Sequence, residues 1–199
     1  MSRSLTDSMP ARADTQSAKP APSTGVPSVR QAKTIQRLCD ATVEELAEHP
    51  FEDMSIRSVA RRAGVAPATA YTYFSSREQL VTEVFWRRFS NLAEVEPSDQ
   101  ALAVTLDGFA LLVADDPSLA RACSMAMLSH DPAVKTLRDQ IGRELRRRLM
   151  GASTELDSNG VRALELAIYG ALVQAGMGHL SYRELPSLLA SVAALMGQI

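Results

Sequence analysis

The sequence predicts an all-α protein, and three observations lead to that fold class. Aromatic residues make up only 5% of the 199 residues, whereas Ala and Leu recur throughout, which favours helices over sheets. Apolar residues repeat at helical spacing, and no segment alternates convincingly with period two. Capping boxes, Asp-Pro pairs and glycines divide the chain into nine expected helices. We therefore expect a three-helix head followed by a body of roughly six helices.

Composition excludes several classes of protein. Two cysteines, Cys39 and Cys123, cannot build a disulfide framework and fit a reducing cytoplasm. No apolar run approaches the roughly 20 residues that span a bilayer, and the N-terminus has no hydrophobic signal segment. The three histidines, His49, His130 and His179, lie far apart and have no partners at metal-ligand spacing. We expect a cytoplasmic protein without a membrane partner, a metal or a cofactor.

The net charge of −2 hides an uneven distribution. Residues 30–90 carry nine basic and eight acidic side chains, whereas residues 91–199 carry nine and thirteen. A near-neutral head on an acidic body can still bind DNA if the cations of the head face one way. Net charge alone therefore does not exclude a nucleic-acid partner.

The first helix is expected to follow an N-terminal arm. Residues 1–28 are rich in Ser, Pro, Ala and Thr, and such a segment cannot bury enough apolar surface to offset its ordering entropy. Ser28 is a plausible N-cap. An amphipathic stripe runs from Ile35 to Ala47 and ends at the pair His49-Pro50.

The segment after this helix has the pattern of a helix-turn-helix. Ser55 suits the N-cap of a short helix over Ile56–Ala63, and Gly64 follows as a residue that can take a positive φ. Pro67 then opens a second short helix that runs to Tyr73. The residues expected to fill the seam are Val59, Ala60, Ala63, Val65, Ala70 and Phe74. The residues left facing outward are Arg57, Arg61, Thr69, Thr72 and Tyr73.

The remaining helices are delimited by caps and prolines. A capping box over Ser76–Gln79 opens a fourth helix that is expected to continue to Val95. Further helices are expected over 99–114, from Asp116-Pro117, from Asp131-Pro132, over 159–178 and over 182–197. Pro186 lies inside the first turn of the last helix, so its start is set only to within a few residues.

Residues 54–80 closely resemble the TetR family of transcriptional repressors. The matching positions are Val59-Ala60, Ala63-Gly64-Val65, Thr69, Tyr71, Tyr73-Phe74 and Ser76-Arg77-Glu78. The motif resemblance covers about residues 30–85, and the helix count extends it to the end of the chain. Two positions depart from the family: Ala66 replaces the usual Ser or Thr cap, and Ala70 replaces the usual Leu. Loss of the cap costs about 1 kcal/mol.

The resemblance implies a repressor that binds a palindromic operator in double-stranded DNA as a homodimer and is released by a small-molecule effector. It divides the chain into an arm (1–28), a DNA-binding domain (29–77) and an effector-binding and dimerisation domain (78–199). The candidate DNA contacts are Ser55, Arg57, Arg61, Pro67, Ala68, Thr69, Tyr71, Thr72, Tyr73 and Arg77. Hydroxyls and arginines suit phosphates, and threonine methyl groups suit thymine. The second short helix has no Arg, Asn or Gln, so readout is expected to use DNA shape, Arg57 and Arg61, or a flexible basic arm around Arg30 and Lys33.

The effector is expected to be hydrophobic or amphipathic, because the body is rich in Leu, Ala, Val, Phe and Met. The candidate effector contacts are Phe89, Leu106, Phe109, Cys123, Met127, Tyr169 and Gln174, although apolar residues at this spacing are more often core. The run Arg146-Arg147-Arg148 is interpreted as solvated surface in preference to a site for an anion or coenzyme A.

The last two helices are expected to form the dimer interface. The first stripe of the penultimate helix contains Leu164, Ile168 and Leu172, and the last helix contributes Leu188, Val192 and Leu195. Leu166, Val173 and Met177 form part of a second stripe. Helices that are apolar on more than one face need a second partner, which a twofold mate supplies.

Two other classes of function compete with this interpretation. An enzyme is disfavoured, because the sequence has no Gly-rich phosphate loop, nucleophile elbow or H-E-x-x-H motif. The alternative that stays open is a non-enzymatic helical interaction module that uses the three-helix head on a protein partner. The outward Arg, Ser, Thr and Tyr side chains favour phosphate over an apolar protein groove.

Overall fold

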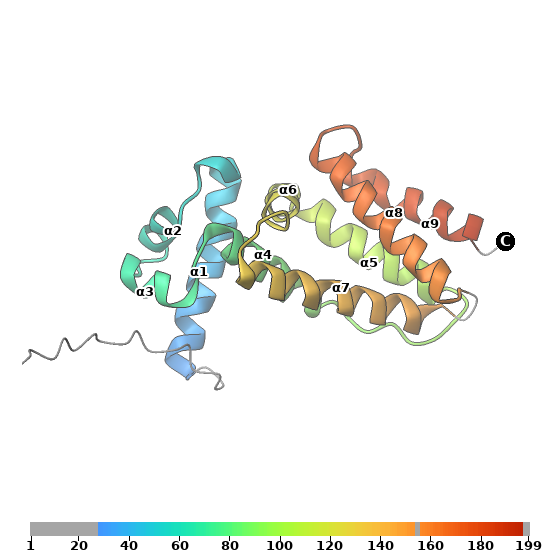
Figure 1. Cartoon of the computed structure of the whole chain (residues 1–199), viewed down its shortest axis with the longest axis horizontal. Helices are drawn as coiled ribbons and strands as arrows, with labels where there is room; N and C mark the ends of the chain where they lie inside the picture. Colours follow the sequence, from blue (N-terminus) through green and yellow to red (C-terminus); the bar gives the residue numbers. More distant parts are fainter. Residues whose placement is uncertain (1–27, 154–155, 197–199) are drawn as a thin grey trace, which may run out of the picture.

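The computed structural model describes residues 28–153 and 156–196, and in these ranges every regular element is a helix (Figure 1). The α-helices are α1 (Val29–Glu48), α2 (Ile56–Arg62), α3 (Pro67–Tyr73), α4 (Arg77–Ser90), α5 (Ala101–Asp115), α6 (Pro117–Ala126), α7 (Pro132–Ala152), α8 (Ser158–Gly176) and α9 (Leu185–Met196). Two short 3₁₀ helices, η1 (Phe51–Asp53) and η2 (Tyr182–Glu184), precede α2 and α9. The all-α class is confirmed. Apart from Ser28, the expected N-terminal arm lies outside the described residues.

Helices α1 to α3 form a head at one end of the molecule, and α5 to α9 form the body (Figure 1). Helix α4 joins the two, because it packs on α1 on one side and on α6 and α7 on the other. Its core-facing side chains, among them Leu80, Val84 and Phe89, are buried. A shift of the body can therefore reach the head through α4.

The head folds as its local sequence signals predict. Ser28 and Ser55 each form a capping box at the start of α1 and α2, in which the serine side chain accepts a backbone N–H three residues ahead. Gly64 has a φ of 61° in the turn between α2 and α3. Helix α3 begins at Pro67 behind Ala66, which makes no side-chain cap. Every residue expected in the seam is buried except Val65, which is half-buried.

The turn of the helix-turn-helix is held by an arginine from α1. The Nη2 group of Arg37 donates to the carbonyl oxygens of Ala63 and Gly64, and the second distance is 3.0 Å. These carbonyls lie at the free C-terminal end of α2, where a cation is favourable. A Cβ added at Gly64 would lie 2.9 Å from Arg37 Nη2. Arg37 therefore ties α1 to the turn between α2 and α3.

Replacing Gly64 with Ala should lower the free energy of unfolding by about 1–2 kcal/mol, because the new Cβ meets a left-handed backbone and the Arg37 guanidinium. Urea unfolding followed by circular dichroism measures the change. The matched control is Gly108→Ala in the interior of α5, where nothing lies within 4 Å of the added Cβ. That variant should gain about 0.5–1 kcal/mol from helix propensity. Equal changes in the two variants would contradict the role of the Gly64 turn.

Helix α4 ends at Ser90 and not at Val95 as the sequence predicts. Arg148 of α7 explains the difference. Its guanidinium donates to the carbonyl oxygens of Leu92 at 3.0 Å and Ala93 at 3.2 Å, and it lies 5.6 Å from the Phe89 ring. These contacts replace the helical hydrogen bonds that the carbonyls would otherwise need. Arg148 is only 8% exposed.

Aspartate caps define the helices of the body. Asp116, Asp131 and Asp157 accept backbone N–H groups in the first turns of α6, α7 and α8, as the Asp-Pro signals predict for the first two. The expected last helix splits, since η2 occupies Tyr182–Glu184 and α9 starts only at Leu185, so that Pro186 lies in its first turn. Across the described ranges, no helix is both long enough and apolar enough to span a bilayer.

Candidate nucleic-acid interface and small-molecule cavity

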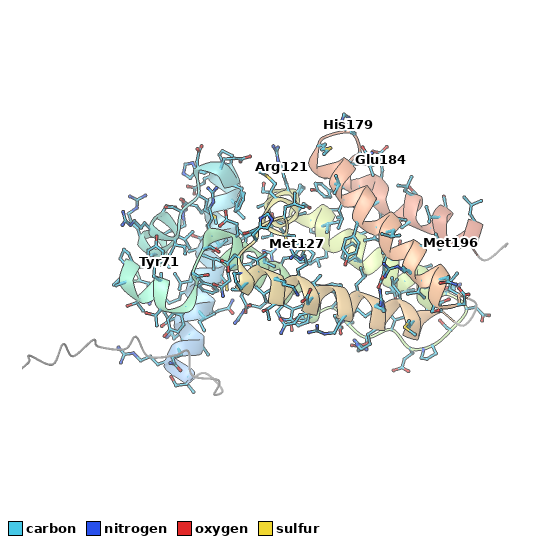
Figure 2. The ribbon with its side chains drawn as sticks, viewed as in Figure 1. Tyr71, Arg121, Met127, His179, Glu184 and Met196 are labelled. Atoms are coloured by element: carbon cyan, nitrogen blue, oxygen red, sulfur yellow. The ribbon has the colours of Figure 1, made fainter. Side chains whose placement is uncertain are left out.

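The outer face of the head gathers most of the predicted DNA contacts. Arg57 and Arg61 on α2 are exposed, and so are Pro67, Ala68, Thr69, Tyr71 and Thr72 on α3. Tyr71 is 48% exposed and lies on the outer side of the head, away from the body (Figure 2). The Thr72 hydroxyl donates to the Ala68 carbonyl at 3.1 Å, so that its proton is used within the helix. This face combines two cations with hydroxyl and methyl groups, which suits a DNA groove.

Three of the predicted contacts are also part of the structure of the head. Ser55 uses its hydroxyl to cap α2, at 3.0 Å from the backbone nitrogen of Ser58. Tyr73 is half-buried and packs against the core. Arg77 lies behind the face: its Nη1 group donates to the carbonyl oxygens of Phe51, Glu52 and Met54 at 2.6–3.1 Å.

The position of Arg77 therefore differs from the sequence interpretation, which named it as a DNA contact. Its guanidinium also lies 4.7 Å from the centre of the Phe51 ring, and its Nε group donates to Glu78 at 3.1 Å. A side chain with these partners fastens η1 to the start of α4, whereas a phosphate clamp requires outward donors. The structure assigns Arg77 a structural role.

Two further basic sites involve α1. Arg62, which directly follows the candidate phosphate contact Arg61, faces α1, where Nε donates to Glu45 at 2.7 Å and Nη1 to Glu48 at 2.9 Å. The hydrogen bond from Arg62 lowers the pKa of Glu48. Arg30 and Lys33, expected in a flexible arm, lie in the first turns of α1 and are exposed.

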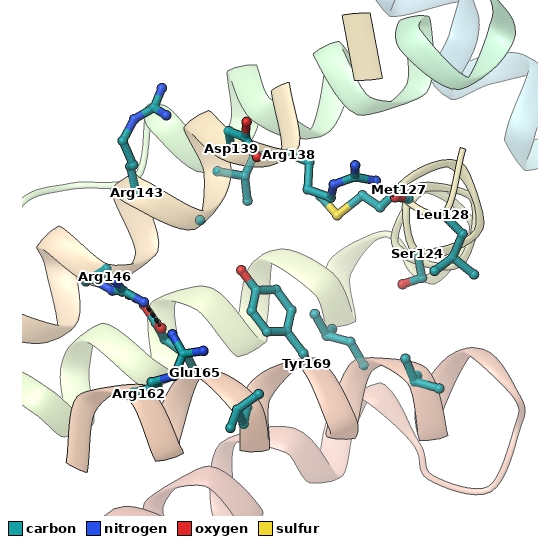
Figure 3. Close-up of a pocket in the computed structure, with 15 residues that line it drawn as sticks. Ser124, Met127, Leu128, Arg138, Asp139, Arg143, Arg146, Arg162, Glu165 and Tyr169 are labelled. Carbon is teal, nitrogen blue, oxygen red and sulfur yellow. Dashed lines mark hydrogen bonds and ion pairs between the residues drawn. The ribbon is translucent and has the colours of Figure 1, made fainter. Parts of the chain in front are cut away.

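A cavity of about 730 Å³ lies between α7 and α8 and is closed at one end by the end of α6 (Figure 3). Helix α6 contributes Ser124 to its wall, and the turn after α6 contributes Met127 and Leu128. Helices α7 and α8 contribute arginines, two carboxylates, Tyr169 and several aliphatic side chains. The volume falls within the range of about 300–1,000 Å³ that is usual for small-molecule sites.

An ion pair bridges the two long walls of this cavity. Arg146 on α7 and Glu165 on α8 meet in a bidentate pair, with N–O distances of 2.8 and 2.6 Å. Glu165 is only 6% exposed, and the hydrogen bond to it raises the pKa of Arg146. Tyr169 points into the cavity in Figure 3, and a Cβ on Gly142 across from it would lie 3.4 Å from its hydroxyl. Burial raises the pKa of this hydroxyl, so it stays protonated at neutral pH.

The predicted effector contacts separate into three groups. Met127 and Tyr169 line the main cavity, and with Phe109 and Cys123 they also line an inner cavity of about 30 Å³ that continues it into the core. Phe89 and Leu106 instead line a separate cavity of about 210 Å³ beside α7. Gln174 is exposed and lines none of these three cavities, so none of them supports its assignment as an effector contact.

The run Arg146-Arg147-Arg148 is not a uniformly solvated surface as the sequence interpretation had it. Arg148 is buried, Arg146 lines the cavity, and Arg147 pairs with Glu94 at 2.5 Å and Glu144 at 2.6 Å. Successive residues of a helix point 100° apart, so three arginines in a row necessarily face different surroundings. The sequence has no signal for these surroundings because the partners are distant in the chain.

The predicted dimer stripe of α8 faces its own chain. Leu164 and Ile168 are at most 1% exposed, so these two residues are not available to a partner, whereas Leu172 is half-buried in the cavity wall. The second stripe is the exposed one: Leu166, Val173 and Met177 are 63%, 47% and 68% exposed.

Helix α9 also has an exposed apolar edge. Leu188 is 43% exposed and Leu195 is 65% exposed, and their spacing of seven residues places them on one face. Val192, expected in the same interface, is half-buried and packs against the core of its own chain. The exposed large apolar side chains of α8, of its C-cap and of α9 are Leu166, Tyr169, Val173, Met177, Leu188 and Leu195, and the first three of these also line the cavity.

Across the described ranges, no group of three or more His, Cys, Asp or Glu side chains is arranged to hold a metal ion. Both cysteines are buried free thiols, and burial raises the pKa of Cys39 to about 12. Neither thiol has the lowered pKa of a catalytic nucleophile.

Comparison with known proteins points to one family over most of the chain. Residues 38–84 match the family described as bacterial regulatory proteins, tetR family. An uncharacterised HTH-type transcriptional regulator of Mycobacterium tuberculosis is 41% identical over 174 residues, which cover 84% of this chain and 82% of that protein. The HTH-type transcriptional repressor KstR of Rhodococcus jostii is 25% identical over 159 residues, covering 77% and 75% of the two chains.

A solved structure agrees with the fold. The crystal structure of a TetR transcriptional regulator from Rhodococcus superposes with a TM-score of 0.70 at 23% identity. The match covers 85% of this chain and 97% of that one, so it includes the body as well as the head.

Proposed function

This chain belongs to the TetR family of transcriptional regulators, and we propose that it is a cytoplasmic repressor that binds a palindromic operator as a homodimer and is released by an amphipathic small molecule. Members of this family are regulators and not enzymes, so the enzymatic alternative is set aside. The observation that carries the proposal is the exposed face of α2 and α3, with its two arginines, two threonines and Tyr71.

Operator binding is supported by the chemistry of that face. Arg57 and Arg61 supply cations for phosphates, and neither has a described carboxylate within 4 Å. Helix α3 offers Pro67, Ala68 and the methyl group of Thr69 for apolar contact with bases. Because α3 has no side chain for bidentate base recognition, we expect DNA shape to contribute to sequence preference.

Dimerisation is supported by the exposed apolar surface of α8 and α9. Five large apolar side chains are 43–68% exposed on these two helices. Such a surface is costly in water and is covered most simply by the same surface of a second copy. A symmetric dimer would present two α3 helices to two half-sites of a palindrome. We assign repression and not activation because KstR, which is similar to this chain over most of its length, is a transcriptional repressor.

Effector release is supported by the cavity between α6, α7 and α8. Helices α6 and α7 both pack on α4, which also contacts α1 of the head. A ligand that separates α7 from α8 would therefore shift α4 and change the position of the head. The ligand acts by binding one conformation more tightly than the other.

The proposal is tested by selection of random DNA duplexes with the purified full chain at two salt concentrations. Recovery of one palindrome, with an affinity that falls steeply as salt rises, would support a dimeric operator-binding protein. Weak binding without an enriched sequence would contradict it. In that case the interaction-module function of the head becomes the better explanation.

Substitutions in the head should separate phosphate contacts from base contacts. Arg61→Ala should weaken binding to all duplexes alike and reduce the slope of log affinity against log salt by about one. Thr69→Ala should instead change the preferred bases, with a cost of about 1 kcal/mol on the best operator from the lost methyl contact. Mobility-shift titrations on the selected operator and on a scrambled duplex measure both effects. Arg183→Ala, an exposed arginine of η2, is the control and should leave affinity unchanged.

A further inference from the structure

The cavity between α7 and α8 has a cationic end and a largely apolar end, at which Arg138 is held by the Met127 carbonyl. Figure 3 shows Arg143, Arg146 and Arg162 at one end, and Met127 and Leu128 at the other, with the Tyr169 ring between them. The distance between the ends is spanned by aliphatic side chains of α8. A ligand that satisfies both ends must itself have a polar end and an apolar end.

The cationic end has more positive than negative charge. Four arginines and two carboxylates line the whole cavity. Of the carboxylates, Glu165 is bound by Arg146, and Asp139 is bound at 2.6 Å by Lys135, which lies outside the lining. The fourth arginine, Arg138, donates to the carbonyl oxygen of Met127. Both carboxylates thus have partners, and the cavity has an excess of guanidinium groups.

Arg143 and Arg162 are the guanidinium groups left for a ligand. Both line the cavity and both are exposed. Among the described residues, no carboxylate lies within 4 Å of either one. They come from the two opposite walls, α7 and α8. Guanidinium groups that border a cavity without a carboxylate partner favour a carboxylate or phosphate, because both anions accept paired N–H donors.

The apolar end leads into the core. Met127, Ile141 and Leu172 line both the main cavity and the inner cavity, which is also lined by Phe109 and Cys123. The inner cavity, at about 30 Å³, holds no large group as it stands. Met127 and Leu172 are only partly buried, and a flexible methionine can move to admit an alkyl chain.

We propose that this cavity binds an amphipathic anion, with its acidic head at Arg143 and Arg162 and its alkyl chain directed past Tyr169 toward Met127 and Leu172. The inference rests on the proposed function, because it names the chemical class of the effector. A free fatty acid and its coenzyme A thioester share this chemistry, since both have an anionic group attached to an alkyl chain.

Calorimetric titration of the full-length chain tests the assignment with three probes of one chain length: decanoate, decanoyl-coenzyme A and decan-1-ol. We expect one of the two anions to bind at least about tenfold more tightly than the neutral alcohol. The anion that binds more tightly shows whether the ligand is a free fatty acid or a coenzyme A thioester. Hexanoate should bind more weakly than decanoate by about fourfold per methylene removed. Equal affinity for decanoate, decanoyl-coenzyme A and decan-1-ol would overturn the anionic assignment, and so would the absence of binding by both anions.

Two double variants test whether the acidic group of the ligand binds at Arg143 and Arg162. The double variant Arg143→Gln, Arg162→Gln should lose at least about tenfold in affinity for the anion and keep its affinity for decan-1-ol. The matched control, Arg121→Gln with Arg183→Gln, removes two exposed arginines outside the cavity and should bind the anion as the unaltered chain does. An equal loss in both double variants would overturn the site.

Operator binding without ligand separates this inference from the proposed function. The chain and both double variants should bind the selected operator equally, because none of the four arginines lies in the head. If the operator is bound but no anion is, the ligand assignment fails and the proposed function stands. If anions are bound but no operator is, the proposed function fails.

Discussion

The double variant Leu188→Arg, Leu195→Arg is expected to be a folded monomer that has lost operator binding. Both leucines lie on the exposed edge of α9, so the substitutions disturb little of the chain's own core. In a dimer they would place guanidinium groups in an apolar interface without partners, which costs several kcal/mol. Binding of two linked heads gains about 10²–10⁴-fold over binding of one head. We therefore expect operator affinity to fall by at least about hundredfold.

Analytical ultracentrifugation and mobility-shift titration measure the two parts of this prediction. The matched control is Leu111→Arg with Met150→Arg, which adds the same charge at apolar side chains that are 55% and 54% exposed on α5 and α7. The control should remain a dimer and bind the operator normally. A Leu188→Arg, Leu195→Arg variant that stays dimeric and binds the operator would refute the assignment of this surface. Val192→Arg is a poorer test, because Val192 packs in its own core.

On α8 the stripe that was predicted to face a partner is buried, and the other stripe is exposed. This difference shows what periodicity can predict. Leu164 and Leu166 are both apolar, and both stripes have helical spacing, so the sequence indicates a helix with two apolar faces. Which of the two faces is buried depends on how α8 packs on α7 and α9, and no local sequence signal predicts that packing. The presence of two apolar faces on this helix was predictable, and which of them is exposed was not.

The head was more predictable because its signals are local. Ser55, Gly64 and Pro67 each act within a few residues through a cap, a positive φ or a fixed φ, and α2 and α3 begin at their predicted positions. The residues that sequence reasoning missed act over long distances. Arg37 contacts Gly64 across 27 positions, and Arg148 contacts Ala93 across 55.

The cavity is lined both by residues that the sequence predicted and by residues that it did not predict. Met127 and Tyr169 were expected near an effector because they are large residues on apolar helices, and both line it. The cationic end was missed. Arg146 acquires its role only through Glu165, which is on another helix, and Arg162 is isolated in the sequence and gave no signal. Charged residues are assigned to solvent by default from sequence alone, and only the fold shows which ones share a cavity.

A hydrogen-bonded contact joins the start of α7 to the turn behind the recognition helix α3. The Asp131 Oδ2 atom accepts from the hydroxyl of Ser75 at 3.0 Å and from that of Ser76 at 2.5 Å. Ser75 and Ser76 lie between the end of α3 and the start of α4, which Ser76 caps. Two turns further along, α7 forms the cavity wall with Arg138 and Ile141. The contact therefore connects the wall of the cavity to the segment between α3 and α4.

This contact should be constant over the neutral pH range. The hydrogen bond from Ser76 lowers the pKa of Asp131 below its usual value. A lowered pKa in the folded state means that the stabilisation is fully present above the unfolded pKa and is lost only as the pH falls through the folded pKa. We therefore expect ligand-driven release to have no pH dependence from Asp131 between about pH 6 and 8.

Replacing Asp131 with Ser is expected to uncouple the ligand from the operator. Serine keeps the N-cap of α7, where Asp131 Oδ1 accepts from Ala133 at 2.8 Å, but it lacks the second oxygen that binds Ser75 and Ser76. Affinity for the operator alone and for decanoate alone should stay within about threefold of the unaltered chain, since a surface cap exchange costs little. The factor by which decanoate weakens operator binding should fall by about tenfold, which lies within the usual range of coupling energies.

The matched control for this prediction is Asp157→Ser, because Asp157 caps α8 in the same way but contacts no residue of the head among the described hydrogen bonds. It should release the operator normally. Coupling is reciprocal, so operator DNA must weaken decanoate binding by the same factor, and a calorimetric titration of the complex checks the first measurement independently. If decanoate released the operator equally from the two variants, the packing of α4 alone would couple the cavity to the head. If Asp131→Ser fails to bind the operator even without ligand, the contact instead holds the head in its DNA-binding position, and the direction of its action is the reverse of the one expected.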